Sequence, residues 1–280
     1  MSRSKALAQG AQTLADAGLE DPRSEARLLL GAALGVGLEG LIGAPERALE
    51  NGQRQHFEAL INRRAAREPA AYILGQREFW SLDFTVNGAT LIPRPDSETL
   101  IEVALDGMSD CDAPHRLLDF GTGSGCLLLA LLSELPGACG LGVDISPEAL
   151  AVAHGNAARL GLGERARFLC GDWGRAVAGS HDLIVANPPY IEDGEMAGLA
   201  PEITRFEPAS ALAGGPDGMA CYRALAPDIA RLLAPGGLAV IEVGAGQADA
   251  VAAVMSAQGL AEKGRRQDLA GVERCLLLQR

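Results

Sequence analysis

The chain has 280 residues, and 48% of them are hydrophobic, which is enough for one large packed domain or for a small domain and a larger one. Its formal charge is −12, which argues weakly against a nucleic-acid partner because an acidic surface repels phosphate groups. The six cysteines are scattered without a C-x-x-C pair, so the sequence predicts neither a metal site nor a disulfide framework. With no apolar leader and no apolar run of about 18 residues, we expect a cytoplasmic protein without a membrane span.

The N-terminal region, residues 1–68, is predicted to form a small helical bundle. Its first helix ends near Gly18, and a second one spans 21–35, where Asp21 serves as N-cap before Pro22. A short helix over 45–49 and a longer one over 51–68 complete the bundle. The basic and acidic residues of this region balance, so the excess of acidic residues belongs to the rest of the chain.

Residues 69–96 are predicted to link this bundle to a larger domain. Within them, 78–92 alternate apolar and polar side chains and are rich in residues that favour strands. Asn87-Gly88 is a dipeptide typical of tight hairpin turns, so we expect a β-hairpin that turns there. Ser97 or Asp96 is then expected to cap the helix that follows.

Residues 97–280 alternate between strand and helix patterns. This order predicts an α/β fold with a mostly parallel sheet and helices on both of its faces. The expected strands span 115–120, 138–145, 165–172, 181–186, 238–244 and 272–280. The expected helices span 97–108, 124–135, 146–161, 218–237 and 247–259.

A glycine-rich turn, "LLDFGTGSG" at 117–125, follows the first of these strands. Gly121, Gly123 and Gly125 lack a Cβ atom and therefore let the backbone approach a ligand at the carboxyl end of the strand. The pyrophosphate-binding fingerprint requires Gly or Ala at position 126, where this chain has Cys. The pattern thus favours a ligand without a pyrophosphate, although a tight turn without any ligand would also satisfy it.

Acidic residues end the next two strands. Asp144 lies about 20 residues beyond the glycine turn, the spacing at which an acid hydrogen-bonds ribose hydroxyls. Asp172 is placed to accept from an adenine amino group, and the indole of Trp173 is placed to pack on the adenine ring. Taken singly, each residue also has a structural explanation: Asp144 as a helix cap, Asp172 as an exposed carboxylate and Trp173 as a half-buried indole. Together with the glycine turn they predict a nucleoside pocket.

The fourth expected strand ends in Asn187-Pro188-Pro189-Tyr190. By itself this is a proline-rich turn, but in order after "DFGTGSG", Asp144 and "GDW" it resembles the motif of S-adenosylmethionine-dependent methyltransferases that act on planar amide or amino nitrogens. Further segments resemble the HemK/PrmC family, namely 71–105, 207–226, 233–247 and 265–274. The resemblance implies a seven-stranded Rossmann-like domain. It also implies methylation of the glutamine N5 atom in the Gly-Gly-Gln loop of class I peptide-chain release factors.

The resemblance also assigns roles to residues. It implies cofactor contacts from Gly121, Thr122, Gly123, Ser124, Gly125, Asp144, Asp172, Trp173 and Asn187. It implies a substrate site built from Asn187, Pro188, Pro189 and Tyr190, of which Asn187, Pro188 and Tyr190 are the expected catalytic residues. Arg94 and Glu207 lie in segments that resemble the family's active-site surroundings, and each of them either lines the pocket or only fixes the local chain path.

The Asn-Pro-Pro-Tyr motif fits the chemistry of a poor nucleophile. The nitrogen lone pair of a glutamine amide is delocalised into its carbonyl group. Acceptors on the two N–H bonds, namely the Asn187 side-chain carbonyl and the Pro188 backbone carbonyl, favour a geometry in which the lone pair faces the methyl group. Tyr190 offers an aromatic face to the substrate amide and to the sulfonium cation.

Two other functions compete with protein-glutamine methylation. A DNA or rRNA amino-methyltransferase meets the same electronic problem and uses an aromatic residue to stack a flipped base. A cofactor-binding scaffold without catalysis is the third hypothesis. The leading hypothesis uses the helical bundle to dock the release factor, and we expect a monomer that has no direct nucleic-acid contact and no metal.

Overall fold

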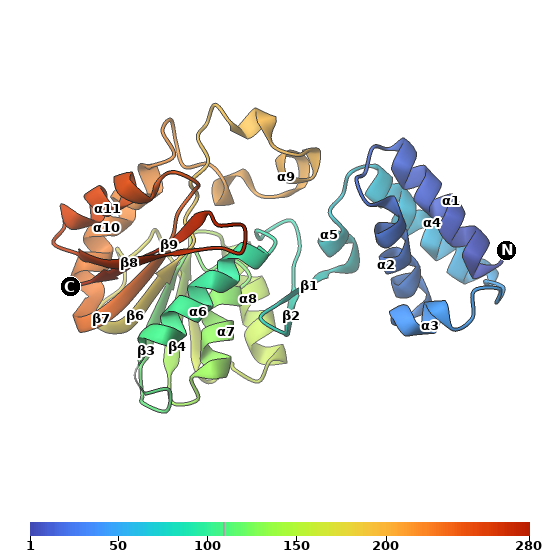
Figure 1. The fold of residues 1–280 in the computed structure, drawn as a ribbon. Coiled ribbons are helices and arrows are strands. Elements are labelled where there is room, and N and C mark those ends of the chain that lie inside the picture. Colours follow the sequence, from blue (N-terminus) through green and yellow to red (C-terminus); the bar gives the residue numbers. More distant parts are fainter. Residues whose placement is uncertain (109) are drawn as a thin grey trace. The chain divides into compact units, whose positions relative to one another are not determined.

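The computed structural model describes residues 1–108 and 110–280, with only the backbone described at Leu38 and Ile42. The chain divides into two compact units, which we call the helical unit and the sheet unit (Figure 1). The helical unit comprises Met1–Gly75 together with Ala200–Phe206. The sheet unit comprises Gln76–Leu199 and Glu207–Arg280.

The helical unit packs short amphipathic helices around an apolar core that includes Leu14, Leu29 and Phe57. The predicted N-cap is confirmed, since the Asp21 side chain accepts a hydrogen bond from the Ser24 amide at 3.3 Å. Gly35 ends that helix in the left-handed conformation that glycine adopts without strain. The helices are α1 (Arg3–Asp16), α2 (Pro22–Leu34), α3 (Leu38–Ile42), α4 (Asn51–Ala65), α5 (Ala70–Leu74) and α9 (Pro201–Phe206).

The helix predicted over 45–49 is wrong. The segment forms a turn followed by a β-bridge from Ala48 to Ser2, and the short helix of this region is α3 instead. The carbonyl groups of Pro45 and Arg47 accept hydrogen bonds from the amides of Ser4 and Arg3. The segment therefore satisfies the otherwise unpaired amides at the start of α1, which a helix of its own would not do.

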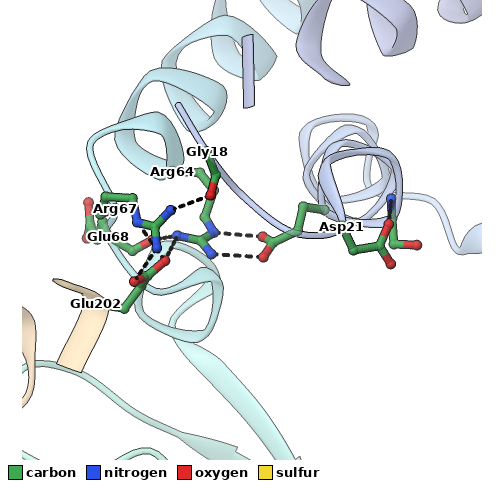
Figure 2. A network of polar contacts seen from close by, with 8 residues as sticks. Gly18, Asp21, Arg64, Arg67, Glu68 and Glu202 are labelled. Carbon is green, nitrogen blue, oxygen red and sulfur yellow. Dashed lines mark hydrogen bonds and ion pairs between the residues drawn. The ribbon is translucent and has the colours of Figure 1, made fainter. Parts of the chain in front are cut away.

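Ion pairs join α2, α4 and α9 within the helical unit (Figure 2). Arg64 on α4 holds the Glu25 carboxylate with two hydrogen bonds, at 2.7 and 2.9 Å, and donates to Glu202 at 3.1 Å. Arg67 donates to the second oxygen of Glu202 at 2.9 Å and to the Gly18 carbonyl at 3.0 Å. Because the Arg64 side chain is only 9% exposed, these contacts are shielded from water and contribute more than surface pairs.

Replacement of Arg64 by alanine is expected to destabilise the helical unit by about 3 kcal/mol, because it leaves two partly buried carboxylates without their partner. Amide hydrogen exchange along α2 and α4 measures this change. Arg54→Ala is the matched control, since its pair with Glu58 is about half exposed on both sides and should contribute less than about 0.5 kcal/mol. Equal effects of the two substitutions would contradict the role given to Arg64.

The sheet unit contains a seven-stranded, mostly parallel sheet in the order β5-β4-β3-β6-β7-β9-β8. Strands β3 to β7 run parallel, and β9 is antiparallel to both of its neighbours. This confirms the predicted fold class. The strands are β3 (Arg116–Phe120), β4 (Cys139–Asp144), β5 (Ala166–Cys170), β6 (His181–Ala186), β7 (Leu233–Glu242), β8 (Ala261–Gln267) and β9 (Glu273–Gln279).

Helices cover both faces of this sheet, as predicted (Figure 1). One face packs against α6 (Glu98–Gly107), α7 (Cys126–Glu134) and α8 (Pro147–Arg159). The other packs against α10 (Ala220–Leu232) and α11 (Ala248–Ser256). Among the residues that the structure describes, no helix combines the length and the hydropathy needed to cross a membrane.

The predicted hairpin exists, but its turn lies elsewhere. Strands β1 (Gln76–Phe79) and β2 (Leu82–Thr85) are joined by Trp80 and Ser81, which both have positive φ. Two residues of positive φ match the twist of the flanking strands. Asn87 instead begins a later turn, in which its carbonyl accepts from the Thr90 amide. The prediction that the chain turns at Asn87-Gly88 within the hairpin is therefore wrong.

Candidate active site

A cavity of about 260 Å³ lies at the carboxyl ends of β3, β4, β5 and β6, within the sheet unit. This is the edge at which ligands bind in open parallel sheets. The cavity gathers residues from all four predicted motifs, together with the segments 89–91 and 208–211. Its lining includes Gly121, Gly123, Asp144, Ile145, Asp172, Trp173, Asn187 and Pro189.

The glycine turn approaches the cavity with its backbone. Gly121, Gly123 and Gly125 all have positive φ, which a residue with a Cβ atom adopts only with strain. A Cβ atom built on Gly121 or Gly123 meets nothing closer than 3.8 Å, so it would occupy the cavity rather than strike the protein. Thr122 turns away and donates to the buried Asp119 at 2.6 Å. Thr122, Ser124 and Gly125 do not line the cavity.

Asp144 is held at the cavity wall by two backbone amides. Its carboxylate accepts from Gly123 at 2.8 Å and from Ser146 at 2.9 Å. These contacts leave lone pairs on both oxygens for a ligand and tie the glycine turn to the end of β4. Asp172 and Trp173 lie beside it at the end of β5, and the indole packs edge-on against Phe120 with ring centroids 6.5 Å apart.

Asn187 and Pro189 complete the wall at the end of β6. The Asn187 Nδ2 atom donates to the Ser97 hydroxyl at 3.1 Å. Among the described residues, none hydrogen-bonds the Asn187 Oδ1 atom. Pro188 is buried and Tyr190 is half-buried, and neither of them lines the cavity itself. The carboxamide thus has an anchored nitrogen and an available oxygen.

Comparison with known proteins shows to which family the chain belongs. Residues 5–75 match the model of the PrmC N-terminal domain, and residues 112–272 match a methyltransferase domain. A release factor glutamine methyltransferase of Rhodospirillum rubrum is 50% identical over 98% of this chain and 84% of its own length. One of Bradyrhizobium diazoefficiens is 45% identical over 95% of this chain and 91% of its own. The chain belongs to the release factor glutamine methyltransferase family.

This family membership confirms the resemblance predicted from the motifs. The fold is also that of a methyltransferase from Pyrococcus furiosus, which is 16% identical and superposes with a TM-score of 0.53 over 79% of this chain and 96% of its own. The residue roles expected from the motifs remain predictions. Within the described part of the chain, no cluster of metal-ligating side chains is present.

Two residues behind the cavity wall, Ser97 and Glu242, make contacts that no sequence motif predicts. Ser97, one of the two expected caps, occupies the N-cap position of α6, but its side chain makes no capping hydrogen bond, and its hydroxyl donates to Glu242 Oε2 at 2.6 Å instead. Glu242 ends β7 and is 2% exposed, and its other oxygen lies 3.4 Å from the Tyr190 hydroxyl. Burial raises the pKa of Glu242 to about 7 and that of Tyr190 to about 12. The signal in the sequence was an acidic residue alone inside an otherwise apolar strand.

Arg94 and Glu207 pair with each other. The guanidinium donates to the buried carboxylate at 2.6 Å, and the second carboxylate oxygen accepts from the Ile92 amide at 3.1 Å. Neither residue lines the cavity. Their contacts fix the path of the chain between the hairpin and α6, which is one of the two roles considered for them, and a direct contact with substrate stays a prediction.

Glycines allow the backbone of Tyr190 to pack closely against the 214–218 segment. The Tyr190 carbonyl accepts from Gln247 at 3.0 Å. A Cβ atom on Gly214 would lie 2.7 Å from the Tyr190 Cα atom and 2.8 Å from the Gly218 carbonyl oxygen. These glycines are therefore required by the close approach of two backbones.

Gly214→Ala is expected to destabilise the sheet unit by about 2 kcal/mol and to lower turnover, because the added methyl group forces the two backbones apart. Denaturant unfolding followed by the combined fluorescence of Trp80 and Trp173, both in the sheet unit, and a methyl-transfer assay measure the two effects. Gly194→Ala is the control in the same connecting region, since a Cβ atom there has nothing within 4 Å. Wild-type behaviour of the Gly214 variant would show that the backbone contact tolerates a methyl group.

Proposed function

We propose that this protein transfers a methyl group from S-adenosylmethionine to the side-chain amide nitrogen of the glutamine in the Gly-Gly-Gln motif of class I release factors. One observation carries the proposal, namely the Asn187 carboxamide at the cavity wall with its oxygen available to an amide N–H. Family membership supports the same substrate, since the curated relatives are named for release factor glutamine methylation. The alternative, a DNA or rRNA amino-methyltransferase, is not favoured by these relatives.

The cavity fits S-adenosylmethionine. The glycine backbone at 121–123 leaves room for a ligand at close range, and the two oxygens of Asp144 are placed for a pair of neighbouring ribose hydroxyls. Ile145 is 66% exposed at the cavity wall, and Trp173 faces the same space, so both offer apolar surface to a purine ring. Asp172 supplies an acceptor for an exocyclic amino group.

The cofactor supplies an activated methyl group on a sulfonium centre. The protein must therefore orient the amide nitrogen. Asn187 Oδ1 and the Pro188 carbonyl accept one N–H bond each and turn the lone pair toward the cavity. Both acceptors interact more strongly as positive charge develops on the nitrogen, so they stabilise the transition state more than the ground state. The ring of Pro188 fixes its φ, and the following Pro189 restricts its ψ, so the Pro188 carbonyl is held in place.

Residues around Asn187 and the helical unit have supporting roles in this function. Tyr190 offers its ring to the substrate amide, and Arg94 and Glu207 shape the approach to it. Thr122, Ser124 and Gly125 act by holding the glycine turn in shape. The helical unit docks the release factor, and residues 5–75 support this because they match the N-terminal domain of the same family. We expect a cytoplasmic monomer that binds no nucleic acid directly.

The proposal is tested by incubating the purified protein with S-adenosylmethionine and a class I release factor. Mass spectrometry of the Gly-Gly-Gln peptide should show one added methyl group on the glutamine. A release factor with Gln→Ala in that motif is the control and should gain none. Methylation of duplex DNA or ribosomal RNA in place of the release factor would establish the alternative function.

A further inference from the structure

A chain of three side chains runs from the cavity wall into the buried interior of the sheet unit. Asn187 at the end of β6 donates to Ser97 at 3.1 Å, and Ser97 donates to Glu242 at the end of β7 at 2.6 Å. Ser97 is 3% exposed and Glu242 is 2% exposed, so water does not compete for these contacts. The Tyr190 hydroxyl lies 3.4 Å from the other oxygen of Glu242. One carboxylate thus supports both ends of the 187–190 segment.

The number of available hydrogen atoms decides how the carboxamide is turned. An ionised carboxylate only accepts, so the single hydroxyl hydrogen of Ser97 must point to Glu242. The Ser97 oxygen then has only lone pairs to offer, and the group that faces it must be an N–H donor. Asn187 therefore presents its NH₂ group to Ser97, and its Oδ1 atom is directed away from Ser97. The hydrogen-bond network itself assigns the amide orientation.

We propose that Ser97 and Glu242 are positioning residues, which hold the Asn187 carboxamide in the orientation that lets Oδ1 accept from the substrate amide. This inference rests on the proposed function and deepens it. The acceptor at the reacting nitrogen is then oriented before the substrate arrives, and no free energy is spent on turning it during the reaction. Neither residue lines the cavity, so their effect on turnover passes through Asn187 and Tyr190.

The orientation depends on the charge of Glu242. Burial raises the pKa of this carboxyl to about 7, and Asp96 acts in the same direction, whereas Ser97, Arg274 and Tyr190 lower it. Above that pH the carboxylate fixes the Ser97 hydrogen. As the pH falls through about 7, the Glu242 carboxyl becomes protonated and can donate a hydrogen bond to Ser97. The Ser97 hydroxyl hydrogen is then no longer required to point to Glu242, so the Asn187 amide loses its fixed orientation. The turnover number should therefore fall on the acidic side of about 7.

A double-mutant cycle tests this inference, with turnover measured on the release factor at saturating cofactor. Ser97→Ala alone should lower the turnover number about 10²-fold, the size of effect caused by a misplaced catalytic group. In the Asn187→Ala background, Ser97→Ala should change it less than about 2-fold, because the group that it positions is already gone. Cofactor affinity should stay unchanged in both. Ser133→Ala, on an exposed part of α7, is the matched control and should leave turnover unchanged.

Glu242→Gln gives a second, independent measurement that does not depend on how well the serine variant folds. The glutamine cannot ionise, so the acidic limb of the turnover profile near pH 7 should disappear. Additive losses in the cycle, or an acidic limb that persists in Glu242→Gln, would overturn the inference while leaving the proposed function intact. A wild-type protein that methylates no release factor would overturn both.

Discussion

Asn187→Ala is expected to lower methyl transfer to the release factor by about 10²–10³-fold while the affinity for S-adenosylmethionine stays within about 3-fold of wild type, because the lost oxygen stabilises developing charge rather than the bound cofactor. Asn187 lies at the cavity wall, and among the described residues none donates a hydrogen bond to its Oδ1 atom. Single-turnover kinetics with the release factor measures the chemical step, and isothermal titration calorimetry measures cofactor binding.

Asn187→Asp is the informative companion to this substitution. Aspartate keeps an oxygen at the position of Oδ1 but has no N–H to donate to Ser97, whose own hydrogen already points to Glu242. It therefore places a second carboxylate close to a buried one, and we expect turnover nearly as low as that of the alanine variant. If Asn187→Ala turned over at the wild-type rate, the role of this amide in catalysis would be excluded.

The order of elements in the sheet unit was predictable because buried parallel strands and amphipathic helices carry strong periodic patterns. The strand β8 was missed because it lies at the edge of the sheet, and its sequence, "AEKGRRQ", has no apolar residue beyond Ala261. Charged residues suit an exposed edge, since they discourage pairing with other chains. Such a strand is recognised only once its neighbour, β9, is in place.

The hairpin turn was misplaced for a related reason. Trp80 and Ser81 do not favour positive φ, whereas Asn87 and Gly88 do. The turn is held by side chains from other elements, since the Trp80 amide donates to Glu98 at 2.8 Å and its indole donates to Glu134 at 2.8 Å. Those partners come from α6 and α7, so local sequence preference does not contain the information that places the turn.

The residues of the candidate site also differ in whether local sequence predicts them. The glycine turn, Asp144 and the 187–190 segment were predictable because each one lies at the end of a strand, and parallel strands end at a common edge. Ser97 and Glu242 were not, because they lie 90 and 145 residues from their respective partners, Asn187 and Ser97, and carry no local motif. Residues that line the cavity are thus found from motifs, and those that hydrogen-bond to them from behind emerge only from the packed structure.

The second large effect is expected at Asp144, in cofactor binding rather than in the chemical step. Its carboxylate fixes the Gly123 and Ser146 amides and has lone pairs left for two ribose hydroxyls. Loss of these charge-assisted hydrogen bonds in Asp144→Ala should cost about 3 kcal/mol, which corresponds to a dissociation constant for S-adenosylmethionine raised about 100-fold. Calorimetry measures it directly, and saturating cofactor should restore most of the turnover.

Two further variants test the specificity of this effect. Asp144→Asn loses the charge and one of the two backbone hydrogen bonds but keeps one acceptor oxygen, so its affinity for the cofactor should lie between those of the wild type and the alanine variant. Glu148→Ala removes an exposed negative charge from the next helix and should leave the affinity unchanged. If Asp144→Ala bound the cofactor as tightly as the wild type and lost only turnover, the nucleoside would have to lie elsewhere, because no carboxylate that holds two ribose hydroxyls is removed without cost to affinity.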